Sequence, residues 1–338
     1  MVRARAVATS GEAASGKRGG RGRDRNVDTI VALVAGGGAG AISRTVMSPL
    51  ERMKVLLQVQ EVSLVPPERR YRGMIDCLVR IPREQGFLAY WRGNGVNVIR
   101  MVPNSAIKFS SYDTFKRWAF PNGEKSYAGR ELYERKMLCG AMSGVAALIP
   151  VYPLDVARTR LTADVAVVRR YSGLVDCLVK TASAEGVLGL YKGLGISLAG
   201  IMPYLAISLS LYDALKEASR RLESRSLRAY AESPFGLFSL GSLAAVVSQT
   251  VAYPFDTVRR HMQVSGAAGQ QNRYRGTAHC VRTIWQTSGA RGFYRGVAAN
   301  AVRAAPQTGL EFAVFDLLRS WLLTLRPLPV DEGRRAVE

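Results

Sequence analysis

The feature that most constrains the fold is a motif that occurs three times, at intervals of about one hundred residues. Each copy reads P-x-[DE]-x-x-[KR], and the copies begin at Pro49, Pro153 and Pro254. Such a period indicates structurally equivalent units, and it has to be recognised before other patterns are interpreted. We therefore expect three tandem repeats in place of the two or three unrelated domains that 338 residues would otherwise indicate.

Three further motifs keep the same register in every repeat. A Tyr-x-Gly triplet ends at Gly73, Gly173 and Gly276. A [WY]-[RK]-Gly triplet ends at Gly93, Gly193 and Gly296. The last motif, [YF]-Asp-x-x-[KR], has its acid at Asp113, Asp213 and Asp316. The predicted boundaries are a basic tail at 1–26, repeats at 27–120, 132–222 and 234–325, and a C-terminal tail at 326–338.

Apolar segments between the motifs are long enough to cross a membrane, for which about twenty helical residues are needed. The clearest segments run from Thr29 to Ser48, from Leu138 to Tyr152 with its continuation, and from Gly236 to Tyr253. The even-numbered segments, near 96–118, 197–218 and 300–324, carry charges, and we expect them to fail a simple hydropathy test. Glycines in the odd segments favour close helix packing in a membrane, whereas each would cost a soluble helix about 1 kcal/mol. The sequence therefore predicts an all-α membrane protein.

The charge balance requires an anionic partner. Lys and Arg outnumber Asp and Glu by 47 to 26, which gives a formal net charge of +21. The basic residues recur at fixed places in each repeat and are separated by apolar segments, so we expect an anionic solute or lipid and no nucleic acid. Four cysteines without a C-x-x-C pair and two histidines predict no metal site, no cofactor and no enzymatic activity. The Arg-, Ala- and Gly-rich residues 1–26 predict a disordered tail or an organelle-targeting extension.

These motifs resemble those of the mitochondrial carrier family over about residues 27–325. The resemblance implies a multi-pass protein of the mitochondrial inner membrane, with six tilted transmembrane helices in three two-helix repeats of pseudo-threefold symmetry and three short matrix helices. It also implies cardiolipin at the Tyr-x-Gly and [WY]-[RK]-Gly motifs, where helix-end N–H groups meet a lipid phosphate. Since each repeat supplies one third of the pore, we expect a functional monomer.

Charged residues of the proline motif predict a gate at one end of the pore, which the resemblance places on the matrix side. A proline within a transmembrane helix kinks it, so three equivalent prolines are expected to close one end of the pore. The acid and the base of each motif can pair between neighbouring repeats. The predicted matrix gate contains Glu51, Asp155, Asp256, Lys54, Arg158 and Arg259. By resemblance, Gln58 and Gln263 brace it, and Thr162 replaces a third glutamine; the alternative is a set of purely structural ion pairs.

A second ring near the far ends of the even helices predicts a cytoplasmic gate. Its charged members are Asp113, Lys116, Asp213, Lys216, Asp316 and Arg319. Tyr112 and Tyr212 are predicted to brace it through their hydroxyls, or else to pack as interfacial aromatics. A desolvated ion pair gains Coulomb energy and loses hydration, so either ring is expected to open when a bound substrate compensates. This is alternating access around a site between two gates.

Positions that break the threefold symmetry predict the substrate site. Seven residues after the [WY]-[RK]-Gly glycines, the even helices carry an arginine in repeats one and three and a glycine in repeat two. Two guanidinium groups suit a di- or triphosphate, and the glycine leaves an apolar slot for an adenine ring. The predicted substrate-binding residues are Arg44, Arg100, Gly200, Ile201, Tyr204 and Arg303. The alternative is that these arginines only pair with pore acids such as Glu311.

The same residues resemble the ADP/ATP carrier branch of the family, most closely in residues 75–86 and 152–161. One departure is the segment Arg259-Arg260-His261-Met262-Gln263, where that branch has three arginines and then three methionines. We therefore expect exchange of adenine nucleotides (ADP, ATP or AMP). The alternatives are a coenzyme A carrier, an ATP-Mg/phosphate carrier and a proton-leak uncoupling carrier.

Overall fold

The computed structural model describes residue 31 and residues 34–62, 67–165, 170–221, 226, 233–267 and 273–324. All regular elements in these ranges are helices, which confirms the all-α prediction. The tails predicted at 1–26 and 326–338 lie outside the described residues. The chain forms two compact units, one of Met1–Ser43 with Thr308–Glu338 and the other of Arg44–Gln307.

The helices follow the same order three times. Residues 34–46 are helical, and the rest of repeat one contains α2 (Ser48–Val59), α3 (Met74–Gln85) and α4 (Asn94–Ala119). Repeat two contains α5 (Gly129–Ala163), α6 (Leu174–Glu185) and α7 (Leu194–Arg220). Repeat three contains α9 (Pro234–Val251), α10 (Tyr253–Val264), α11 (Thr277–Phe293) and α12 (Val297–Thr324). Short 3₁₀ helices are η1 (Pro67–Arg69), η2 (Phe87–Trp91), η3 (Glu124–Ser126) and η4 (Val187–Tyr191).

The motif prolines interrupt the odd helices in two of the three repeats. Turn residues Met47 and Ala252 precede α2 and α10, and the proline then occupies the first turn of the new helix. Proline is tolerated there because the first N–H groups of a helix have no intrahelical partner. In repeat two, by contrast, α5 continues through Pro153. The odd helix is therefore interrupted at the motif proline in repeats one and three and continuous through it in repeat two.

Two helices of the described residues are long and apolar enough to cross a membrane, Glu131–Ala163 and Val187–Arg220. Only 28% and 6% of their apolar windows are buried within the protein, whereas the core helix of a soluble protein would be mostly buried. The second helix contradicts the expectation that every even-numbered segment fails a hydropathy test. In its α7 part, Leu194–Arg220, the acidic and basic residues Asp213, Lys216, Glu217 and Arg220 are confined to the last turns, so the stretch from Leu194 to Tyr212 is uncharged.

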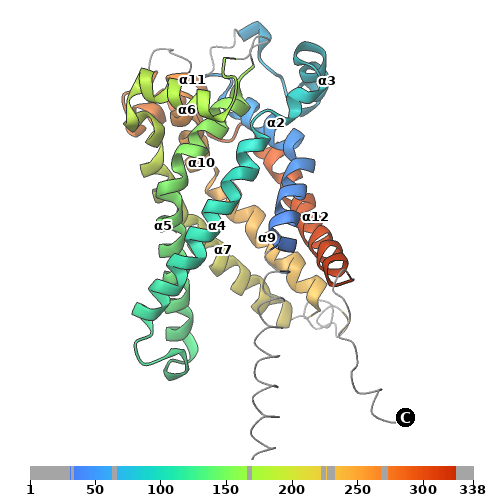
Figure 1. Ribbon diagram of the computed structural model, residues 1–338, viewed down its shortest axis with the longest axis vertical. Coiled ribbons are helices and arrows are strands. Elements are labelled where there is room, and N and C mark those ends of the chain that lie inside the picture. The colour runs from blue at the N-terminus through green and yellow to red at the C-terminus, as the bar shows by residue number, and fades with distance from the viewer. Residues whose placement is uncertain are drawn as a thin grey trace, which may run out of the picture. The chain divides into compact units, whose positions relative to one another are not determined.

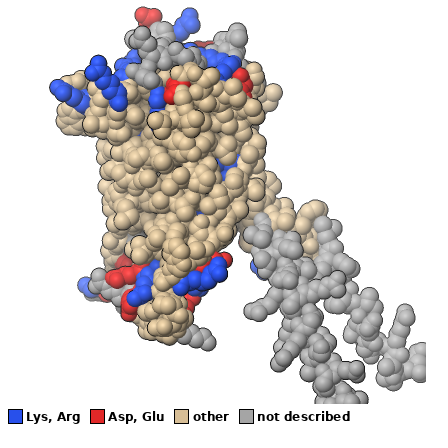
Figure 2. Space-filling model, turned by 60° about the vertical axis from the view of Figure 1, so that its left-hand side comes forward, with Lys and Arg blue, Asp and Glu red and all other residues tan. Residues whose placement is uncertain are grey.

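The surface of the unit Arg44–Gln307 has the charge distribution of a membrane protein. Figure 2 shows a broad band with few charged side chains between two ends where Lys, Arg, Asp and Glu gather. The short helices α3, α6 and α11 lie together at one end, and the α4–α5 connection lies at the other (Figure 1). Such a band fits the hydrocarbon core of a bilayer, with the short helices near one membrane surface.

Glycines of the [WY]-[RK]-Gly motif allow each repeat to pack closely against the next. Gly93, Gly193 and Gly296 have φ between 83° and 84°, a region that favours glycine. A Cβ atom at each position would lie within 3.1 Å of the next repeat: near Thr162 for Gly93, near Arg259 for Gly193 and near Lys54 for Gly296. Each glycine thus contacts the helix that follows the motif proline of the next repeat, in a closed cyclic order.

Three buried apolar clusters lie where the short helices meet the proline-motif helices. Each cluster includes one of Cys77, Cys177 and Cys280, which occupy equivalent positions and are fully buried free thiols. Burial raises the pKa of the Cys77 and Cys280 thiols to about 12 and the pKa of Cys177 to about 11. The equivalent cysteines of the three repeats are therefore packed, protonated thiols.

Candidate functional site

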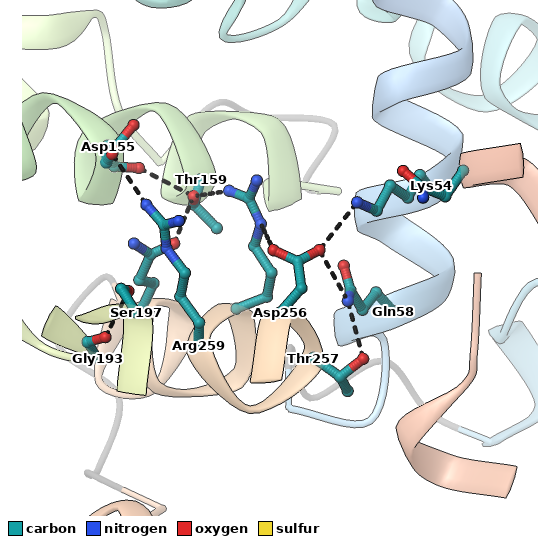
Figure 3. A network of polar contacts seen from close by, with 12 residues as sticks. Lys54, Gln58, Asp155, Thr159, Gly193, Ser197, Asp256, Thr257 and Arg259 are labelled. Carbon is teal, nitrogen blue, oxygen red and sulfur yellow. Dashed lines mark hydrogen bonds and ion pairs between the residues drawn. The ribbon is translucent and has the colours of Figure 1, made fainter. Parts of the chain in front are cut away.

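The six charged residues of the predicted matrix gate form three ion pairs, each between two repeats. The pairs are Lys54 Nζ to Asp256 Oδ2 at 2.9 Å, Arg158 Nη2 to Glu51 Oε1 at 2.5 Å, and Arg259 Nη2 to Asp155 Oδ2 at 2.9 Å. Because α2, α5 and α10 each supply one acid and one base, the three helices are joined in a ring. Figure 3 shows two of the three pairs, Lys54 with Asp256 and Arg259 with Asp155. Like the motif glycines, the three ion pairs join repeat one to repeat two, repeat two to repeat three and repeat three to repeat one.

Each ion pair is largely but not completely removed from solvent. The side chains of Lys54 and Asp256 are 8% and 28% exposed, and those of Arg158 and Glu51 are 9% and 18% exposed. Partial desolvation strengthens the attraction between the charges but also removes hydration from both of them. The three ion pairs can therefore hold the helices together and still be separated when a ligand compensates for the lost attraction.

The predicted braces differ in what they contact. Gln58 Nε2 lies 3.5 Å from Asp256 Oδ2 and donates to Thr257 Oγ1 at 2.9 Å (Figure 3). Gln263 lies outside the ion pairs and accepts a hydrogen bond at 2.8 Å from Thr159. Thr162, at the third position, donates at 3.4 Å to the Arg92 carbonyl. Only Gln58 therefore contacts a charged member of the ring directly.

Buried arginines that the sequence analysis did not single out tie the ring to the short helices. In repeat two, Arg160 pairs with Glu185 at 2.5 and 3.0 Å. In repeat one the corresponding acid is replaced by Gln85, and Arg52 donates to its Oε1 at 2.6 Å. Because Arg52 lies three residues after Pro49 and Arg160 seven residues after Pro153, a search for equivalent positions does not pair them.

Repeat three has no counterpart of the Arg160–Glu185 pair and is linked to repeat one instead. Ser288 stands where repeat two has Glu185, and its hydroxyl donates to Glu61 Oε1 at 2.8 Å. Arg295 forms an ion pair with the same Glu61. His261 Nε2 lies 2.8 Å from the Gln58 carbonyl, and its Nδ1 lies 3.2 Å from the Tyr274 hydroxyl. A carbonyl only accepts, so Nε2 carries the proton and Nδ1 accepts. Repeats one and three lack the acid of repeat two, and hydrogen bonds of Gln85 and Ser288 take the place of its ion pair.

A cavity of about 290 Å³ lies directly against the ring, near the lower end of the size range of small-molecule sites. Of the predicted substrate-binding residues, Gly200, Ile201, Tyr204 and Arg303 line it. Ring residues Lys54, Asp256 and Arg259 also line it, as do Gln249 and Asn300, two amides that the sequence analysis missed. Three cationic side chains and one carboxylate among the lining residues make the cavity electropositive.

Gly200 lines the cavity, but the prediction that its missing side chain leaves the slot is wrong. A Cβ atom at Gly200 would lie 3.0 Å from Cβ of Phe255 on α10. The space that a side chain would occupy is therefore filled by Phe255, and the glycine allows α7 and α10 to approach. The apolar wall of the cavity is formed by Phe255 together with Ile201 and Tyr204.

The predicted arginines differ in their surroundings. Arg100 does not line the cavity and forms an ion pair with Asp155, while Arg303 Nη1 lies 3.6 Å from Glu51 Oε2. The alternative that these arginines pair with pore acids therefore has structural support, with the gate acids as the partners. Arg44 makes no ion pair with a described residue and does not line the cavity.

The charged residues of the predicted cytoplasmic gate do not pair with one another within the described part of Arg44–Gln307. Asp113 and Asp213 are exposed. Lys116 pairs instead with Glu124 at 2.6 Å, and Lys216 Nζ lies 5.9 Å above the ring of Tyr212. Asp316 and Arg319 belong to the other unit, where both are exposed. The matrix ring is therefore formed, and the members of the predicted cytoplasmic ring that lie in Arg44–Gln307 do not pair with one another.

Comparisons with known proteins identify the family. The family model described as "Mitochondrial carrier protein" matches residues 25–123, 132–222 and 230–326. The chain is 40% identical over 296 residues to "ADP/ATP translocase 4" of Mus musculus, covering 86% of this chain and 89% of the relative. It is 42% identical to "ADP/ATP translocase 4" of Homo sapiens, covering 80% and 85%, and 38% identical to "ADP/ATP translocase 3" of Homo sapiens, covering 80% and 90%. The chain belongs to the mitochondrial carrier family, and it is a multi-pass transporter of the mitochondrial inner membrane, not an enzyme.

Proposed function

We propose that this carrier exchanges adenine nucleotides across the inner membrane by alternating access. The observation that carries the proposal is the electropositive cavity, whose three cations include two bases of the ion-pair ring, Lys54 and Arg259. An anionic substrate bound there competes with Asp256 and Asp155 for these bases. The relatives at about 40% identity are named ADP/ATP translocases, which supports a nucleotide as that anion.

The competition links substrate binding to opening of the ring. A ligand shifts a conformational equilibrium only by binding one state more tightly than the other. Phosphate groups that bind Lys54, Arg259 and Arg303 replace part of the attraction that the gate acids provide, so separating the ion pairs costs less free energy. Arg100, which pairs with Asp155 in this structure, binds the phosphates once it leaves that acid. The proposed substrate-binding residues remain those predicted from the sequence, Arg44, Arg100, Gly200, Ile201, Tyr204 and Arg303, of which the last four line the cavity.

The pairing state of the two rings supports alternating access. The proposed matrix gate (Glu51, Lys54, Gln58, Asp155, Arg158, Asp256, Arg259 and Gln263) has its three ion pairs formed. The members of the proposed cytoplasmic gate (Tyr112, Asp113, Lys116, Tyr212, Asp213, Lys216, Asp316 and Arg319) that lie in Arg44–Gln307 form no ion pair with one another. In the state that opens toward the matrix, we propose that the cytoplasmic gate is paired and the matrix gate is not. Exposed acids such as Asp113 then gain partners while Asp256 loses Lys54.

Cardiolipin is the proposed lipid partner. One pocket of about 450 Å³ joins Tyr71, Arg72 and Gly73 to Arg295 and Gly296 of another repeat. Another, of about 350 Å³, joins the motif that ends at Gly93 to the motif that ends at Gly173. Both contain a helix N-terminus and an arginine, which together suit a lipid phosphate. Because the paired ring lies within one chain, we propose that a monomer is functional.

Uptake of labelled ADP by cardiolipin-containing liposomes tests the proposal. Arg100→Ala and Arg303→Ala should each lower the initial rate at least about tenfold, because each removes a charge-assisted contact to phosphate. Arg83→Ala, an exposed arginine on α3, is the matched control and should stay within about twofold of the wild type. Wild-type uptake by either of the first two variants would overturn the proposed site.

A further inference from the structure

A chain of hydrogen bonds joins Arg303 to two amides on the cavity wall. Arg303 Nη2 lies 3.4 Å from Asn300 Oδ1, and Asn300 Nδ2 donates to Gln249 Oε1 at 3.0 Å. On its other side, Arg303 Nη1 donates to Gln307 Oε1. Asn300 is 5% exposed, and Gln249 comes from α9 while the other three residues come from α12. Gln249, Asn300 and Arg303 all line the cavity beside the ring.

The chemistry of this chain fixes which way each amide points. A guanidinium only donates, so Asn300 must present its oxygen to Arg303. Its NH₂ group then faces Gln249, which has to accept through Oε1. Gln249 is left with its NH₂ group, two N–H donors, beside the cavity. Arg303 thus determines that Gln249 is a donor at the cavity surface and not an acceptor.

Gln249 lies on α9 and is joined to Arg303 through Asn300. Arg303 is one residue away along the hydrogen-bond chain, whereas the apolar wall of Ile201 and Tyr204 belongs to α7, the helix that packs beside α9 (Figure 1). A substrate whose phosphates bind the cations would place its sugar and base toward this wall. Ribose hydroxyls and the ring nitrogens of a purine are acceptors that match an amide N–H donor.

We infer that Gln249 is a specificity-determining residue, which donates a hydrogen bond to the nucleoside part of the substrate while the cations hold the phosphates. This inference rests on the proposed nucleotide exchange and adds a residue to it. A site built to hydrogen-bond a substrate group discriminates strongly against a ligand that lacks the group. Gln249 would therefore separate nucleotides from polyphosphates that carry no nucleoside.

Ligand-induced thermal stabilisation of the purified full-length carrier, titrated with ADP, GDP, CDP, UDP and inorganic pyrophosphate, tests this role. Gln249→Met keeps the length of the side chain and removes its donors. We expect the apparent affinity for ADP to fall about tenfold, the effect of one lost hydrogen bond, and the affinity for pyrophosphate to change less than about twofold. Gln286→Met, on the exposed surface of α11, is the matched control and should leave both affinities unchanged.

The outcomes separate this inference from the function on which it rests. An equal loss of ADP and pyrophosphate affinity in Gln249→Met would overturn it, because Gln249 would then act only by positioning Arg303. Unchanged affinities for both ligands would overturn it as well. If no nucleoside diphosphate stabilises the wild-type carrier, the proposed nucleotide exchange fails, and the role of Gln249 fails with it.

Discussion

Replacing Asp256 by Asn tests whether the ion-pair ring holds the observed state together. The substitution keeps the size of the side chain but leaves Lys54, which is 8% exposed, without its carboxylate partner at 2.9 Å. Removing one partner of a buried ion pair costs about 3–5 kcal/mol. Because the Asp256 side chain is 28% exposed, solvent recovers part of this, and we expect about 2–3 kcal/mol.

Asp256→Asn destabilises the state in which the ring is paired and leaves the open state unaffected by the loss of this pair. A cost of about 2–3 kcal/mol changes the equilibrium between paired and open states by roughly 30- to 150-fold. It should also lower the melting temperature of the purified carrier by roughly 4–12 °C, at about 2–4 °C per kcal/mol. Exchange kinetics in liposomes should change in parallel, since opening of this ring is a step of the proposed transport cycle.

A double-mutant cycle isolates the pair itself. Lys54→Met, Asp256→Asn and the double variant should show a coupling free energy of at least about 1.5 kcal/mol. The same cycle on Asp213→Asn and Lys216→Met, which form no pair in the described structure, should give less than about 0.5 kcal/mol. Additive losses for the first pair, or an Asp256→Asn carrier with wild-type stability and kinetics, would refute a gating role for this pair.

Three further predictions concern packing and burial. Gly200→Ala would force a Cβ atom to 3.0 Å from Phe255 and should lower stability by about 1–3 kcal/mol in thermal unfolding, whereas Gly140→Ala, where no atom lies within 4 Å, should not. Arg160→Met should cost about 3 kcal/mol because it removes a buried partner of Glu185; an unchanged melting temperature would contradict this. Maleimide at pH 8 should label none of the short-helix thiols in the native carrier and all of them after unfolding, because their pKa values of about 11–12 keep them protonated; native labelling would contradict the burial of Cys77, Cys177 and Cys280.

Features that obey the threefold symmetry could be predicted from the sequence. An acid and a base at fixed offsets from each motif proline predict a cyclic arrangement in which every base meets an acid of another repeat, as Lys54 does with Asp256. The same holds for glycines such as Gly93, whose positive φ and close contact with the next repeat are shared by all three copies. One copy of either motif would predict little, but three copies in the same register predict equivalent contacts between the repeats.

Features that break the symmetry depend on packing and were only partly predictable. Arg52 donates to Gln85 from a different turn of its helix than the turn from which Arg160 donates to Glu185. In repeat three the partner of Ser288 is Glu61, which lies outside the motifs. The contact of Phe255 with Gly200 depends on how closely α7 and α10 approach, which no residue spacing determines. Gln249 has no equivalent in the motifs, so its place at the cavity became evident only in the folded chain.

The central claim is nucleotide exchange, and counter-substrate dependence tests it most directly. Liposomes containing cardiolipin and the purified carrier would be preloaded with ADP, ATP, AMP, phosphate, coenzyme A or buffer, and uptake of labelled ADP measured. We predict rapid uptake into vesicles that hold an adenine nucleotide and little uptake into vesicles that hold buffer. Absence of ADP uptake under every load, or a proton conductance that nucleotides only inhibit, would contradict the proposed function.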